Sequence, residues 1–216
     1  MEIRSIVVVG SSGAGKTTLV NSVRGPEYSD GLVVPRRFIT RPPREGDDRS
    51  ENSYLPHDIF DEGVNAGTIW PHWERWFEGG RREQYGFQDY PSLDFRRRVY
   101  SANNAFMRRP SESVFSVLQT SVVIAVVADE DVRAARLRER SPDMSDDERA
   151  VRLSDNGLDI LQNVARLEVI DTTDASPEQG QRAFQNILQT VLGFTVQSRY
   201  EPLPLSWLDG GMPDRP

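Results

Sequence analysis

Runs of apolar, β-branched residues recur along the chain and alternate with amphipathic segments. The segment 3–9 is mostly apolar, and the segment 121–128 reads Ser-Val-Val-Ile-Ala-Val-Val-Ala. Continuous apolar runs of this length are typical of strands buried on both faces of a parallel sheet. Shorter runs at 98–102 and 167–170 predict two further strands.

Helical patterns lie between and after these strands. We expect helices at 17–24, 114–118, 131–140, 145–165 and 177–192. Ser145 and Glu148 have the spacing of a capping box, and Asp129 or Asp131 could cap the helix at 131–140. Strands that alternate with helices indicate an α/β fold with a parallel sheet.

The stretch 36–90 differs in composition from both of its flanks. It is polar and rich in Arg, Pro and Gly, with a short strand predicted at 37–40 and a helix at 58–66. We interpret it as a lobe inserted into a domain that spans 1–195, followed by a Pro/Gly-rich tail at 196–216.

Three tryptophans, Trp70, Trp73 and Trp76, lie within this stretch. Their three-residue spacing fits one face of a helix and simple packing, which we favour. An aromatic wall for a bound ligand is the alternative. His72 lies between two of these residues, and we expect it to be structural.

The composition narrows the classes of function. With 33 acidic and 26 basic residues, the net charge of -7 argues against a nucleic-acid partner. The absence of cysteine excludes thiolate chemistry, and two histidines do not suffice for a multi-His zinc site. No apolar run approaches the roughly 20 residues of a membrane span, and the N-terminus does not resemble a signal peptide. We therefore expect a cytoplasmic protein with no membrane partner.

The octet at 10–17, Gly-Ser-Ser-Gly-Ala-Gly-Lys-Thr, matches the phosphate-loop (Walker A) pattern G-x-x-x-x-G-K-[ST] at every specified position. It follows a predicted buried strand and opens a helix, as this loop requires. Backbone N–H groups and the helix N-terminus bind phosphates, a lysine reaches the β- and γ-phosphates, and a Thr hydroxyl binds Mg²⁺. We predict ATP as co-substrate, Mg²⁺ at Thr17, and an ATP site made of Gly10, Ser11, Ser12, Gly13, Ala14, Gly15, Lys16, Thr17 and Thr18.

Lys16 is the single lysine among the 26 basic residues, and the other 25 are arginine. An arginine bias by itself can reflect genome composition. The lysine is retained where a compact charge is needed and a planar guanidinium fits poorly. The retained lysine therefore supports a phosphate loop that still acts on a nucleotide.

A second motif lies in the predicted lobe, where Arg41 and Arg44 are three residues apart in a loop stiffened by prolines. Arginine is usually a solvated surface charge. Arginines held in this way can instead grip a phosphate through bidentate hydrogen bonds. We predict that this pair binds a phosphate group of the acceptor.

Several motifs together resemble the guanylate-kinase-like group of P-loop kinases. Residues 40–47 match its T-R-x-P-R-x-G-E/D run, and Tyr85 with Gly86 matches its Y-G pair. The lid of that group carries R-L-x-x-R and a later arginine, which Arg136, Arg140 and Arg152 match. The resemblance covers roughly residues 3–192.

This resemblance implies a P-loop NTPase three-layer α/β fold with an inserted substrate-binding lobe and an arginine-bearing lid at about 138–152. It implies that Lys16 and the three lid arginines are catalytic and contact the ATP phosphates. For the acceptor it implies a site made of Arg41, Arg44, Tyr54, Tyr85 and Asn103. A phosphate acceptor needs no general base. The second Mg²⁺ contact has no assigned residue, since a capping role suits Asp129 better.

Two subfamilies resemble the chain in different ways. Guanylate kinases carry a guanine-reading glutamate and a Ser or Thr after the Y-G pair, where this chain has the segment 67–73 and Phe87. Ribose 1,5-bisphosphate phosphokinases carry E-N-H, a Trp-containing strand and V-N-G, which Glu51-Asn52, 70–73 and 102–104 resemble. We expect an ATP-dependent kinase whose acceptor is a ribose 1,5-bisphosphate-like sugar phosphate or a nucleoside monophosphate. A guanylate kinase proper and an inactive binding module with this fold are the alternatives.

Overall fold

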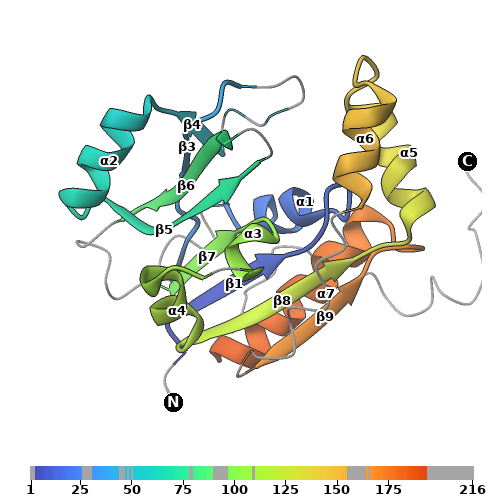
Figure 1. Ribbon diagram of the computed structural model, residues 1–216. Coiled ribbons are helices and arrows are strands. Elements are labelled where there is room, and N and C mark those ends of the chain that lie inside the picture. Colours follow the sequence, from blue (N-terminus) through green and yellow to red (C-terminus); the bar gives the residue numbers. More distant parts are fainter. Residues whose placement is uncertain are drawn as a thin grey trace, which may run out of the picture.

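The computed structural model describes residues 3–25, 31–43, 47, 49, 51–77, 80–89, 97–108, 110–154, 164 and 166–193. Figure 1 shows two sheets with helices around them. Arg44 and the predicted tail at 196–216 lie outside the described residues. Within the described ranges, none of the helices is long and apolar enough to cross a membrane.

The central sheet has the strand order β2-β7-β1-β8-β9, and each neighbouring pair is parallel. This confirms the parallel α/β fold. The four predicted strands are present, whereas the two-residue strand β2 was not predicted. The strands are β1 (Ser5–Val9), β2 (Leu32–Val33), β7 (Arg97–Ser101), β8 (Ser121–Val127) and β9 (Leu167–Asp171).

The helices follow the predicted order, with one short addition, α3. They are α1 (Lys16–Asn21), α2 (His57–Asn65), α3 (Ala105–Arg108), α4 (Glu112–Leu118), α5 (Glu130–Arg140), α6 (Asp146–Leu153) and α7 (Pro177–Leu192). The helix predicted at 145–165 is α6, which ends at Leu153, and residues 155–163 lie outside the described ranges. Ser145 caps α6 by accepting a hydrogen bond from the Glu148 amide. Asp129 is the N-cap residue of α5, as predicted, although its side chain makes no capping hydrogen bond.

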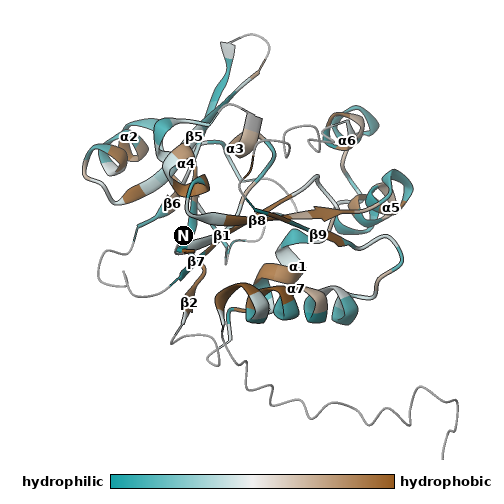
Figure 2. Ribbon diagram, turned by 90° about the horizontal axis from the view of Figure 1, so that it is seen from below, coloured by the Kyte–Doolittle hydropathy of each residue, from teal (hydrophilic) through white to brown (hydrophobic). Residues whose placement is uncertain are grey.

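Alternate residues of the central strands face two separate cores. Ile6 and Val8 pack with α1 and α7. Val7 and Val9 pack with α3, α4 and the second sheet. Figure 2 shows α1 and α7 on one side of the central sheet and α3 and α4 on the other. These layers give the predicted three-layer arrangement.

The second sheet, which we call the lobe sheet, has the strand order β4-β3-β6-β5. Strand β3 pairs in parallel with β4 and antiparallel with β6, which pairs antiparallel with β5. These strands are β3 (Arg37–Ile39), β4 (Asn52–Tyr54), β5 (Ile69–Trp76) and β6 (Arg82–Gln88). In Figure 1 the lobe sheet and helices α5 and α6 lie on opposite sides of α1.

The tryptophan segment is a strand, so the helical interpretation of its spacing was wrong. Successive side chains of a strand point to opposite faces. Trp73 is therefore buried at 1% exposure, while Trp76 on the other face is 60% exposed. The packing role is confirmed for Trp73, whose ring stacks on Tyr85 with centroids 5.4 Å apart and meets Phe106 edge-on at 5.0 Å.

Candidate active site

The phosphate loop joins β1 to α1 and is pressed against its neighbours. Gly10 has φ 148 and Gly13 has φ 82, both in the region that favours glycine. A Cβ at Gly10 would lie 2.2 Å from the Val126 carbonyl oxygen, and one at Gly13 would lie 2.8 Å from that of Arg133. The loop therefore requires glycine at both positions, where its backbone packs against β8 and α5.

The ammonium group of Lys16 lies inside this loop. Its Nζ donates hydrogen bonds to the Gly10 carbonyl at 2.6 Å and to the Ser11 carbonyl at 2.9 Å. A compact cation is thus held at the centre of the loop, beside the N-terminus of α1. This is the place where an incoming polyphosphate would meet it.

A pocket of about 480 Å³ opens in front of the loop, within the size range of small-molecule sites. Among the described residues that line it, seven side chains are cationic and two are acidic, although the whole chain carries a net charge of -7. This local excess of positive charge suits an anionic ligand. The lining residues are Gly10, Ser12, Gly13, Gly15, Lys16, Thr17, Thr18, Arg37, Ile39, Arg41, Asp47, Glu51, Asn52, Arg75, Tyr85, Ser101, Asn103, Asn104, Arg136, Arg140 and Arg152.

Most of the predicted site residues lie at this pocket. Two predicted ATP-binding residues, Ser11 and Ala14, are buried within the loop and do not line it. Tyr54 does not line it either, although its hydroxyl contacts the lining residue Asp47. Arg44 lies outside the described residues.

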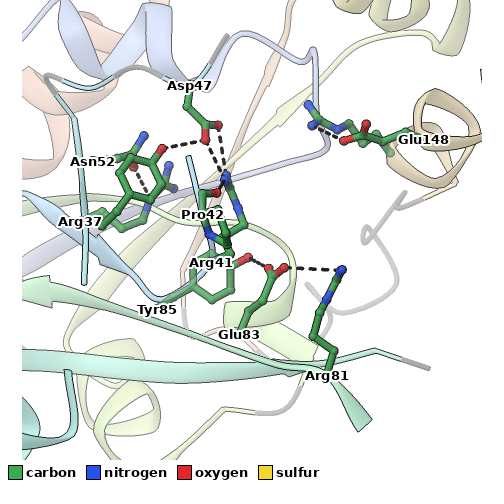
Figure 3. A network of polar contacts seen from close by, with 11 residues as sticks. Arg37, Arg41, Pro42, Asp47, Asn52, Arg81, Glu83, Tyr85 and Glu148 are labelled. Atoms are coloured by element: carbon green, nitrogen blue, oxygen red, sulfur yellow. Dashed lines mark hydrogen bonds and ion pairs between the residues drawn. The ribbon is translucent and has the colours of Figure 1, made fainter. Parts of the chain in front are cut away.

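Arg41 forms a fork-shaped contact with the carboxylate of Asp47 (Figure 3). The two N–O distances are 2.7 Å and 3.1 Å, and the Tyr54 hydroxyl donates to the same carboxylate at 2.7 Å. Burial alone would lower the pKa of Arg41, but the hydrogen bonds and charge of Asp47 outweigh it and raise that pKa. A phosphate has the same acceptor geometry as this carboxylate. Arg41 therefore presents two N–H donors to one anionic group, which is the arrangement of bidentate arginine pairs.

Tyr85 brings a second hydroxyl to the lobe side of the pocket. Its hydroxyl donates to Glu83 at 2.5 Å, and the side chain is 5% exposed. Burial and the hydrogen bond to Glu83 raise the pKa of Tyr85 to about 12. Tyr85 therefore stays protonated at neutral pH and acts as a neutral hydroxyl.

The three arginines of α5 and α6 have different surroundings. Arg136 donates to the Gly13 carbonyl at 3.3 Å and to the Thr172 carbonyl at 2.7 Å, so it ties the phosphate loop to the end of β9. Arg152 donates to Glu148 at 2.7 Å. Arg140 makes no hydrogen bond or ion pair within the described part of the chain, and burial and the charge of Arg152 lower its pKa. Among the described residues Arg140 is thus a pocket cation without an ion-pair partner, although the charge of Asp47 acts on it.

Asn103 is held in place by a buried tryptophan. The indole Nε1 of Trp73 donates to Asn103 Oδ1 at 3.2 Å. This contact fixes which way the amide faces, since its oxygen is occupied. Trp73 therefore positions a pocket residue and does not itself line the pocket.

Sequence reasoning missed several pocket residues. Arg37 donates to Asn52 at 2.9 Å and to the Ser101 carbonyl at 2.9 Å, which links the lobe sheet to β7. Arg75 and the buried Glu51 also line the pocket. The sequence pointed to Glu51-Asn52 only as a match to the E-N-H segment of the family and did not predict that Glu51 belongs to a site.

No family model matches the sequence. The chain is similar to a ribose 1,5-bisphosphate phosphokinase (PhnN) of Methylobacterium radiotolerans, with 41% identity over 69 residues, 32% of this chain and 38% of that protein. It is similar to the protein of the same name from Rhodopseudomonas palustris, with 31% identity over 141 residues, 64% of this chain and 67% of that protein. The chain thus spans well under half of the first relative and about two thirds of the second.

A solved structure of guanylate kinase from Anaplasma phagocytophilum has a similar fold. The TM-score is 0.51 with 14% identity, and the match covers 91% of this chain and 89% of that one. At this identity the likeness shows the fold alone. It agrees with the P-loop kinase fold that the two sheets and the phosphate loop describe.

Proposed function

Because the chain belongs to the ribose 1,5-bisphosphate phosphokinase family of guanylate-kinase-like P-loop kinases, we propose that it transfers the γ-phosphoryl group of ATP to a phosphorylated small molecule. The acceptor class that we favour is a ribose 1,5-bisphosphate-like sugar phosphate. The observation that carries the proposal is that one pocket is lined by Lys16 and the phosphate loop together with Tyr85 of the lobe sheet and Arg41, which follows β3.

In the proposed reaction the phosphates of ATP lie on residues 10–18, and Lys16 turns from the loop carbonyls to the β- and γ-phosphates. Arg41 holds the phosphate of the acceptor in the position that the Asp47 carboxylate has here. An acceptor phosphate oxygen attacks the γ-phosphorus, the bond to the β–γ bridging oxygen breaks, and ADP leaves. Mg²⁺ bound with ATP supplies charge neutralisation on the β- and γ-oxygens.

The arginines of the pocket act on charge and position. In the proposed reaction Arg140 of α5 and Arg152 of α6, which line the pocket, neutralise charge on the transferring phosphoryl group. Arg136 keeps the phosphate loop in place. Phosphoryl transfer needs little covalent chemistry from a protein, so oriented cations supply most of the catalysis. The attacking phosphate oxygen is already anionic and needs no general base.

One feature favours a sugar phosphate over GMP. Glu74, the first acid after the tryptophan pair, forms an ion pair with Arg82 at 2.5 Å and does not line the pocket. The carboxylate of Glu74 therefore lies outside the pocket, where it could not bind a guanine base. The names of the two relatives support the same acceptor class.

A coupled assay of ADP release tests the proposal with ribose 1,5-bisphosphate, GMP, dGMP, AMP and UMP as acceptors. We expect the highest kcat/KM with ribose 1,5-bisphosphate. Efficient phosphorylation of GMP would instead identify a guanylate kinase. If no acceptor supports turnover and Lys16→Ala leaves ATP affinity unchanged, the chain is a binding module.

A further inference from the structure

Thr17 and Glu51 lie side by side at the floor of the pocket, although 34 positions separate them. Glu51 directly precedes β4, and its side chain is almost wholly buried at 3% exposure. The Thr17 hydroxyl donates to Glu51 Oε2 at 3.4 Å. The other carboxylate oxygen, Oε1, is buried and has no hydrogen-bond partner among the described residues.

A buried carboxylate oxygen without a partner is costly unless a ligand completes its environment. Mg²⁺ binds oxygen ligands in an octahedron at 2.0–2.1 Å, so two adjacent ligands lie roughly 3.0 Å apart. The 3.4 Å between Thr17 Oγ1 and Glu51 Oε2 is close to that spacing. The donor set, a hydroxyl and a carboxylate beside ATP phosphates, is the set that Mg²⁺ prefers.

P-loop NTPases hold Mg²⁺ between the loop Ser or Thr and an acidic residue. Among the described residues, two other acids were candidates for that carboxylate. Both oxygens of Asp47, the second acid that lines the pocket, accept hydrogen bonds from Arg41 or Tyr54, whereas Glu51 Oε1 has no partner among the described residues. Asp129, which follows β8, is exposed and does not line the pocket. The strand next to β1, β7, ends at Ser101 and is followed by Ala-Asn-Asn at 102–104, so this strand end offers no carboxylate.

We infer that Glu51 is the acidic magnesium ligand of this site and acts together with Thr17. The inference rests on the proposed function, since it assumes that ATP binds at the loop. Glu51 is joined to the lobe sheet through the Arg37 amide, which donates to its carbonyl at 3.0 Å. The metal therefore links the nucleotide-binding loop to the lobe that holds the acceptor.

The test compares ATP affinity with and without metal in the full chain. Isothermal titration gives the Kd of ATP in MgCl₂ and in EDTA, and their ratio measures the metal contribution. Loss of an outer-shell partner of a metal ligand already costs about 10- to 100-fold in metal affinity, so loss of a direct ligand should cost at least as much. We expect Glu51→Gln to lower the ratio at least about tenfold while it binds metal-free ATP as tightly as the unchanged chain. Asp129→Asn is the matched control and should leave the ratio unchanged.

A second readout uses Mn²⁺ in place of Mg²⁺. The Mn²⁺ affinity of the ATP complex, measured by electron paramagnetic resonance, should fall in Glu51→Gln and not in Asp129→Asn. An unchanged Kd ratio and Mn²⁺ affinity together with a raised acceptor KM would overturn the inference and assign Glu51 to the acceptor.

Two further outcomes keep the inference separate from folding and from the proposed function. If circular dichroism shows that Glu51→Gln is unfolded, Glu51→Asp takes its place, since it keeps the charge but withdraws the carboxylate by one methylene. A lower ratio in Glu51→Asp supports the inference, and an unchanged ratio overturns it. If the unchanged chain does not bind ATP at all, the proposed function fails as well.

Discussion

Exchange of Lys16 for arginine tests whether the loop needs a point charge and not merely a positive charge. The Nζ atom lies 2.6 Å and 2.9 Å from two loop carbonyls, so the loop closes around one nitrogen. The loop backbone also packs closely against β8, because a Cβ at Gly10 would lie 2.2 Å from the Val126 carbonyl oxygen. A planar guanidinium must therefore stay outside the loop, away from the β- and γ-phosphates.

The expected loss follows from the two hydrogen bonds that the ammonium makes. Hydrogen bonds to charged groups contribute about 1.5–3 kcal/mol each. If both are realised on phosphate oxygens in the transition state, their loss costs about 3–6 kcal/mol. At 1.36 kcal/mol for each factor of ten, kcat falls by about 10²- to 10⁴-fold. The loop amides still bind phosphate, so the Kd of ATP should rise by no more than about tenfold.

The assay is ADP release at saturating acceptor, with ATP affinity measured separately by titration. Arg82→Lys is the matched control, because it exchanges the same two residue types outside the pocket. It should retain the activity of the unchanged chain. A Lys16→Arg variant with kcat within about fivefold of the unchanged chain would refute the reasoning.

Three further predictions concern the lobe sheet. Arg41→Ala should lower kcat/KM for the acceptor by about 10²- to 10³-fold, because a bidentate contact is lost. It should leave ATP affinity unchanged, and equal losses in acceptor use and ATP affinity would contradict the assignment of Arg41 to the acceptor. Trp73→Ala should lower the free energy of unfolding by about 3–5 kcal/mol, since the ring is buried against three aromatic side chains; urea titration measures this, and a loss below about 1 kcal/mol would contradict it. Burial lowers the pKa of His72 below its ordinary value of 6.5, so the unfolded chain binds a proton that the folded chain does not. Stability should therefore fall as the pH drops below about 6.5. In urea titrations at several pH values this fall should be smaller in His72→Gln, and equal slopes for both chains would count against it.

The fold followed from the sequence where the local pattern has one interpretation. Helix α7 has the predicted bounds because Ser176 forms a capping box with Gln179 and Gly193 ends the helix at φ 65. Strand β2 could not be found, since two residues carry no period. The tryptophan spacing misled because an interval of three fits a helix, whereas in β5 it sends Trp73 and Trp76 to opposite faces.

The candidate site likewise contains residues that the sequence predicted and residues that it did not. Lys16 and Arg41 belong to short motifs whose chemistry is local, so the sequence pointed to both. Arg37 and Glu51 reach the pocket because β3 pairs with β4, which sets Arg37 opposite Asn52. A contact that depends on the register of two paired strands cannot be predicted from the spacing of residues along the chain.

The lone lysine inside the phosphate loop also makes the site unusually easy to observe. A chain grown with lysine labelled at Nζ carries one such label among its 216 residues. Its nuclear magnetic resonance spectrum should hold a single lysine side-chain signal, with no assignment to make. That signal reports whether the ammonium is bonded to the Gly10 and Ser11 carbonyls or to phosphate. Each ligand added to the protein could then be followed at the loop itself, without any activity assay.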